Sequence, residues 1–102
     1  MTIEFEWNPE KARANVAKHG VDFETAAKVF DDPFALAEPD NSTSDKERWR
    51  TIGLVRGALL LLVAHTVRDD DDVEIIRIIS ARRTDQAERR RYERARRESS
   101  GR

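Results

Sequence analysis

Apolar residues are concentrated in three stretches of the second half of the chain, and each predicts a β-strand. We expect strands at Trp49–Val55, Leu59–Arg68 and Val73–Ala81, with turns at Arg56–Gly57 and Asp69–Asp72. Connections this short favour antiparallel neighbours, so these strands are predicted to form an antiparallel meander.

The first twenty residues predict a strand followed by a helix. Residues 3–7 alternate apolar and acidic side chains, which is typical of a half-exposed edge strand. Asn8 suits a helix N-cap and Pro9 suits the first helical position. The helix is predicted to end at Gly20, after two basic residues that favour a helix C-terminus.

The remaining segments predict two further helices and a loop. Asp22 can cap a second helix, which the residues before Pro33 terminate. Residues 37–47 are polar and without periodicity, so a loop is predicted there. Asp85 and Glu88 resemble a capping box that opens a last helix reaching about residue 97.

The predicted order is strand, helix, helix, three strands, helix, which indicates a small α+β fold. We expect one domain over residues 1–98 and a frayed tail over residues 99–102. Two helices are expected to cover one face of the sheet and leave the other face open.

Composition and charge narrow the class of protein. Charged residues make up 38% of the 102 positions, and there is no cysteine, so disulfides, thiol catalysis and Cys-ligated zinc are excluded. Residues 77–102 hold ten basic and four acidic residues, a net charge of +6, whereas residues 1–76 carry −7. A basic end on an acidic body favours an anionic partner such as RNA, or an acidic protein. An acidic N-terminus without a long apolar run predicts a cytoplasmic protein without a membrane span.

The stretch EIIRIISARR, residues 74–83, places an arginine inside an otherwise apolar strand. A guanidinium in such a place costs free energy unless a partner binds it, so Arg77 needs an anionic neighbour or a function. His65, near the end of the preceding strand, is the nearest candidate for a shared anion site.

The register between these two strands decides which side chains surround His65. If the acidic turn spans four residues, His65 faces Ile76, and Ser80 and Arg82 share its side of the sheet. A shift of one residue places His65 opposite Arg77 instead. In both registers an arginine is expected on the same face as His65.

Such a set suits RNA cleavage without a metal ion. A base takes the proton of a ribose 2′-OH, cations stabilise the phosphate, and an acid protonates the leaving 5′-oxygen. Histidine and arginine supply these properties, and Tyr92 could stack on a base or donate its hydroxyl. The alternative is that His65 is a strand-end histidine bonded to the backbone, while the arginines pair with nearby acids.

Other polar groups have structural alternatives as well. Lys18 and His19 could contact RNA phosphate, or simply favour the end of their helix. The Asp69–Asp72 run is expected to be a solvated turn and not a metal site, because consecutive acids point in different directions. The basic last helix could bind nucleic acid or be a solvated helix with internal Glu–Arg pairs.

Four segments together resemble the BrnT family, toxins of bacterial toxin–antitoxin pairs. They match in order and spacing, and cover most of the chain except the polar loop and the tail: FEWNPEKARANVAKHGVDFETAAKVFDDP (5–33), ERWRTIG (47–53), LLLVAHT (60–66) and IRIISARRTDQAERRRYE (76–93). Asn8 stands where aspartate is commoner, and the turn VRDDDD is more acidic than usual.

The resemblance implies a RelE-like fold and a ribonuclease that arrests growth by cutting RNA without metal or other cofactor. It also implies a BrnA-like antitoxin with a ribbon-helix-helix domain, through which the complex binds operator DNA. By position, the family's catalytic residues fall on His65, Arg77, Arg82 and Tyr92. The residues expected to contact RNA are Lys18, His19, Arg48, Ser80 and Arg83.

Two functions from different classes follow. The first is a ribonuclease toxin that arrests growth when expressed alone. The second is a catalytically degenerate module that acts as scaffold or co-repressor for its antitoxin. Growth after induction without the antitoxin discriminates between them.

Overall fold

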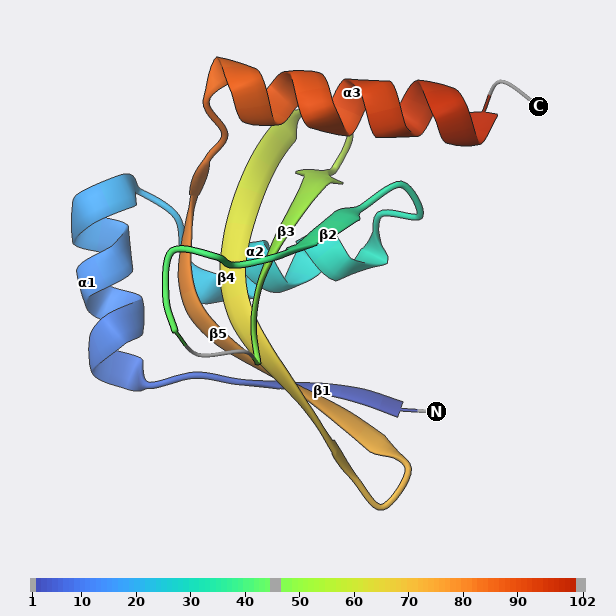
Figure 1. Cartoon of the computed structure of the whole chain (residues 1–102). Coiled ribbons are helices and arrows are strands. Elements are labelled where there is room, and N and C mark those ends of the chain that lie inside the picture. The colour runs from blue at the N-terminus through green and yellow to red at the C-terminus, as the bar shows by residue number, and fades with distance from the viewer. Residues whose placement is uncertain (1, 45–46, 101–102) are drawn as a thin grey trace.

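The computed structural model describes residues 2–44 and 47–100, and within them the fold is of the predicted α+β class, with one strand more than expected. The helices and strands are β1 (Thr2–Glu6), α1 (Pro9–His19), α2 (Phe23–Ala27), the short 3-10 helix η1 (Lys28–Asp31), β2 (Leu36–Pro39), β3 (Arg48–Val55), β4 (Leu59–Asp70), β5 (Val73–Arg83) and α3 (Gln86–Ser100) (Figure 1). Helix α3 continues through residue 100, two residues into the segment expected to fray, and residues 101–102 lie outside the described part. No helix among the described residues is long and apolar enough to cross a membrane.

The five strands form one sheet in the order β1-β5-β4-β3-β2. Strands β3, β4 and β5 make the predicted antiparallel meander, while β1 runs parallel to β5 along its outer edge. Strand β2 was not predicted, because residues 37–47 were expected to be a loop. Its four residues have no periodicity of their own, and pairing with β3 holds them extended, with Leu36 opposite Ile52. Residues 45–46 of the expected loop are not described.

The predicted caps of α1 are present. The Asn8 side chain accepts hydrogen bonds from the backbone N–H groups of Glu10 and Lys11, at 2.8 and 3.1 Å. At the other end Gly20 takes a left-handed conformation, φ 71°, and its N–H donates to the carbonyl of Val16. Both ends of the helix are therefore fixed by local sequence.

Helices α1 and α2 and the η1 turn cover one face of the sheet and enclose the main core. Gly53 of β3 lies directly beneath Val29 of η1. A Cβ atom at Gly53 would come within 2.6 Å of the Val29 Cγ1 atom and 2.8 Å of its carbonyl oxygen, so only glycine fits this contact. The buried core residues on this face are Val21, Phe23, Ala26, Val29, Val55, Leu61, Val63, Ile76, Ile78 and Ala81.

The opposite face is open only in part, because α3 lies across one end of it (Figure 1). Tyr92 of α3 is buried with Ile52, Leu60 and Leu62 in a second apolar cluster. Most of the length of α3 is exposed, and of its described side chains only those of Glu88 and Tyr92 are buried. Beyond α3 this face is lined by arginines from β3, β4 and β5.

The turn between β4 and β5 is shorter than predicted. Only Asp71 and Asp72 form it, both with positive φ (48° and 68°), and Asp70 pairs directly with Val73. Positive φ at both positions is the geometry of a tight two-residue hairpin, and aspartate tolerates it better than most residues. Arg68, expected to end the strand, therefore lies within it.

Strand β5 is longer than its neighbour β1, and α1 completes its free edge. Strand β1 pairs only with residues 73–77 of β5. Further along, the buried Asn15 side chain accepts a hydrogen bond from the Ala81 N–H at 3.1 Å and donates to the Ala81 carbonyl at 2.8 Å. The same amide nitrogen donates to the Val21 carbonyl at 2.9 Å. Asn15 thus satisfies backbone groups that a neighbouring strand would otherwise bind.

We predict that Asn15→Leu lowers the free energy of unfolding by about 2–4 kcal/mol, because it leaves buried backbone groups of Ala81 without partners. Urea unfolding monitored by circular dichroism measures this. The same substitution at the exposed Asn41 is the matched control and should change stability by less than about 0.5 kcal/mol. Equal effects of the two substitutions would contradict the role assigned to Asn15.

Candidate active site

A β-bulge in β5 separates the predicted site residues between the two faces of the sheet. His65 pairs with Ile78, whereas the preceding residue of β4 pairs with Ser80, so Ile79 has no partner. Arg77 pairs with Thr66, one position along from His65, and therefore points to the opposite face. The expectation that an arginine shares the face of His65 is wrong in both of the registers considered. The strands continue through the acidic run, so His65 faces Ile78 and not Ile76, a shift of two residues that leaves the faces unchanged. The bulge at Ile79 then turns Arg82 to the face opposite His65.

His65 lies under the helical layer, and its side chain is only 3% exposed. Its Nε2 atom is 2.7 Å from the hydroxyl of Thr51, and its ring meets that of Phe30 edge-on at 4.9 Å between centroids. Burial lowers the pKa of His65 to about 4, against a smaller opposing effect from the backbone of Thr66. The imidazole is therefore neutral near pH 7 and belongs to the packing of the core.

Arg77 finds its anionic partner on the neighbouring strand. Its guanidinium is 3.0 Å from the Glu6 carboxylate of β1, which also binds Arg68 through two hydrogen bonds of 2.8 and 3.1 Å. Hydrogen bonds from Arg68 and then Arg77 lower the pKa of Glu6 to about 2. One carboxylate is therefore shared by two arginines, and Asp70 also lies close enough to Arg68 to help raise the pKa of that guanidinium.

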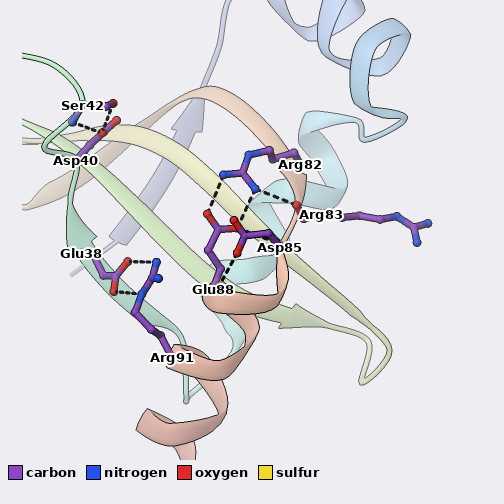
Figure 2. Close-up of polar contacts among 8 residues, drawn as sticks. All are labelled: Glu38, Asp40, Ser42, Arg82, Arg83, Asp85, Glu88 and Arg91. Atoms are coloured by element: carbon purple, nitrogen blue, oxygen red, sulfur yellow. Dashed lines mark hydrogen bonds and ion pairs between the residues drawn. The ribbon is translucent and has the colours of Figure 1, made fainter.

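Arg82 is held by the start of the last helix. Its guanidinium makes two hydrogen bonds of 2.8 Å with the buried Glu88 carboxylate (Figure 2). Glu88 also completes the predicted capping box, in which the Asp85 N–H donates to Glu88 and the Glu88 N–H donates to Asp85. The contact with Arg82 lowers the pKa of Glu88. This carboxylate therefore ties the end of β5 to the first turn of α3.

Other cations of this face also have carboxylate partners. Arg91 of α3 binds Glu38 of β2 through two hydrogen bonds of 2.9 and 3.1 Å, and Arg48 lies 3.8 Å from Asp40. Arg83, at the end of β5, is exposed, and Figure 2 shows its side chain extending away from these pairs.

Tyr92 does not reach solvent as a base-stacking residue would. Its side chain is 3% exposed, and its hydroxyl donates a 2.6 Å hydrogen bond to Asp32. Burial, and then this contact, raise the pKa of Tyr92. Its placement favours a structural role, in which it anchors α3 to the segment after η1.

Three of the expected RNA-contacting residues meet in one hollow of about 240 Å³ between α1 and the bulge of β5. We call it the α1–β5 hollow. Lys18 and His19 reach it from the last turn of α1, and Ser80 reaches it from the residue after the bulge. No carboxylate is among its lining residues, which include Lys11, Asn15, Lys18, His19, Ile79 and Ser80.

Lys11 is the residue of this hollow that was not predicted. Lys11, Asn15 and Lys18 are spaced by four and three positions, so they lie on one face of the helix. An asparagine in the middle of such a face, between two apolar neighbours, marks the side turned to the sheet. The spacing of these three residues could have indicated from the sequence that they share one face of α1. Only the Asn15–Ala81 contact explains why that face of the helix is turned toward β5.

Metal ligands do not gather anywhere among the described residues: no group of three or more His, Asp or Glu side chains could hold a metal ion. The Asp69–Asp72 run forms the exposed tip of the β4–β5 hairpin.

Comparison with known proteins identifies the family. The family model for BrnT, the ribonuclease toxin of type II toxin–antitoxin systems, matches residues 7–88. This chain belongs to the BrnT family. Membership implies an RNA target and an antitoxin partner. The crystal structure of the Brucella abortus ribonuclease toxin BrnT superimposes with a TM-score of 0.61 at 23% identity, over 84% of this chain and 100% of that one, and so shares the fold. A search of curated protein sequences gives no significant match.

We predict that the free energy of unfolding falls as pH drops from 6.5 to about 4. In this range the unfolded chain binds a proton at His65, whereas the buried imidazole of the folded protein stays neutral. A lowered histidine pKa contributes stability above the unfolded value of 6.5, and this contribution is lost toward the folded value. The full loss corresponds to about 3 kcal/mol. Chemical unfolding measured between pH 4.5 and 6.5, above most carboxylate titrations, tests it.

The His65→Gln variant should lose much of this pH dependence, since glutamine can still bond to Thr51 but does not titrate. An unchanged slope in the variant would show that another group causes the dependence.

Proposed function

We propose that this protein is an endoribonuclease toxin that cuts RNA at the α1–β5 hollow without a metal ion. The observation that carries the proposal is the set of side chains lining that hollow: two lysines, a histidine and a serine hydroxyl, with no carboxylate. A phosphate group fits such surroundings, because lysine ammonium groups attract it and a hydroxyl can donate to it.

The same side chains can supply each step of cleavage. His19 can accept the proton of the ribose 2′-OH, since histidine is the side chain that most often acts as a general base. The 2′-oxygen then attacks the adjacent phosphorus, and the ammonium groups of Lys11 and Lys18 stabilise the added negative charge. The bond to the 5′-oxygen breaks, and this oxygen takes a proton from a lysine ammonium. The products are a 2′,3′-cyclic phosphate and a 5′-hydroxyl end.

The residues expected from the family pattern receive supporting roles in this proposal. Arg77 and Arg82 make the open face next to the hollow cationic, although Glu6 and Glu88 already bind them. Arg48 extends this surface, along which RNA can approach through its phosphates, and the exposed Arg83 adds a cation at the end of β5. His65 and Tyr92 are buried and stabilise the two layers that hold the site.

We further propose that cutting RNA arrests growth and that a BrnA-like antitoxin with a ribbon-helix-helix domain neutralises the toxin. The antitoxin would also carry the complex to operator DNA. The RelE-like label for the fold belongs to the same proposal. A protein that forms this complex but leaves growth unaffected would instead be a scaffold or co-repressor.

We predict that Lys18→Ala and His19→Gln each reduce RNA cleavage by about 100-fold or more, because each removes a group that acts on the reacting phosphate or its nucleophile. The assay uses purified protein, free of antitoxin, with end-labelled RNA in EDTA. Products should carry a 2′,3′-cyclic phosphate. Growth after induction of each variant without antitoxin should recover in parallel.

His65→Gln is the matched control, because it removes the other histidine, which is only 3% exposed and lies outside the α1–β5 hollow. It should cleave RNA within a few-fold of the unaltered protein at pH 7. If His65→Gln lost activity while His19→Gln kept it in full, the α1–β5 hollow would not be the active site, and His65 would belong to it instead. Cleavage that stops in EDTA would refute the metal-free mechanism.

A further inference from the structure

A second and larger hollow, about 510 Å³ in volume, opens where η1, the β3–β4 turn and α3 meet. We call it the α3 hollow. In Figure 1 the β3–β4 turn lies beneath α3, whereas α1 lies on the other side of β4 and β5. The charged and aromatic residues that line it are Lys28, Asp31, Asp32, Phe34, Arg56 and Arg96.

An aromatic ring and a guanidinium are stacked at this hollow. The guanidinium carbon of Arg96 lies 4.8 Å from the centroid of the Phe34 ring, and Phe34 packs against the buried cluster beneath α3. The ring thereby supports an exposed arginine. A guanidinium plane held in this way is a surface on which nucleic-acid bases stack.

The acidic residues of the hollow do not cancel its positive charge. Three cations outnumber the two carboxylates among the lining residues. One carboxylate, that of Asp32, is already satisfied from inside the protein. It accepts hydrogen bonds from the backbone N–H groups of Phe34 and Leu54, at 2.9 and 2.8 Å, and from the Tyr92 hydroxyl. Burial raises the pKa of Asp32, but these donors and the nearby charge of Arg96 outweigh it and keep the pKa low.

Arg56 occupies a backbone position that does not suit arginine. It is the first residue of the turn formed by residues 56–58 between β3 and β4 and has φ of 54°, followed by Gly57 at 71°. Asparagine takes this left-handed conformation more readily, so arginine here costs stability. A cation placed at a strained turn and lining a hollow is a candidate for a ligand-binding role.

We propose that the α3 hollow binds one nucleotide of single-stranded RNA, away from the bond that is cut. The base stacks on the Arg96 guanidinium, and the phosphate contacts Lys28 and Arg56. A flat stacking surface next to a net positive charge matches the two halves of a nucleotide, whereas an acidic peptide would need only the charge. The inference rests on the proposed ribonuclease function and adds a substrate contact outside its active site.

The test measures binding of a short single-stranded RNA with 2′-O-methyl groups, which cannot be cleaved, by fluorescence anisotropy. Arg96→Ala should weaken binding by about fivefold or more, the usual effect of losing one stacking contact. It should weaken binding of the matching abasic oligonucleotide much less. Arg89→Ala, an exposed arginine on the same helix, is the control and should change Kd by less than about twofold.

Arg56→Asn separates a binding role from a structural one, because its two effects run in opposite directions. The variant should be more thermally stable, since asparagine relaxes the turn. It should also bind RNA more weakly, with a log Kd against log salt slope lower by about 0.7, the change expected for one lost phosphate contact. A more stable variant with unchanged affinity and slope would overturn the proposal.

Weaker binding of the antitoxin, with RNA affinity unaffected, would also overturn it and identify a protein contact instead. The outcome does not depend on cleavage. If Lys18→Ala and His19→Gln fully retain cleavage, the proposed active site fails while the α3 hollow is still judged by binding alone.

Discussion

The one unpaired residue in β5, Ile79, decides which side chains this protein presents to a ligand. Side chains alternate along a strand, so in a regular strand Arg77 and Arg82 would point to opposite faces. One of the two guanidiniums would then enter the core. The bulge adds a residue between them and brings both to the same side, where Glu6 and Glu88 bind them. The apolar residues Ile78 and Ala81 meanwhile stay in the core.

Local signals predicted most of the elements. Asn8, Asp22 and the Asp85–Glu88 box begin helices where expected, because each uses its own neighbours as hydrogen-bond partners. What failed depended on distant partners. Strand β2 exists only through pairing with β3, and the register of β4 against β5 depends on the turn and the bulge, neither of which has a clear sequence signal.

The candidate site was predicted only in part, again because its geometry depends on partners that are distant in the sequence. Lys18, His19 and Ser80 were chosen from separate motifs, and the structure brings them to one hollow. His65 was the more attractive histidine in the sequence, since it follows an apolar strand and precedes arginines. Its position in the alternation of β4 places its side chain on the core face, beside Phe30 and Thr51. The face that a strand residue occupies is a property of the whole sheet, and a single strand does not encode it.

Asn15 also has a consequence for assembly. An uncovered strand edge can recruit a strand from another molecule, which leads to aggregation or to partner binding by strand addition. In the C-terminal part of β5 the Asn15 side-chain amide already binds the backbone N–H and the carbonyl of Ala81. At the opposite edge β2 ends in Pro39, which has no N–H to offer. A partner that adds a strand to this sheet would therefore find its most complete backbone ladder along β1, on the side away from α3.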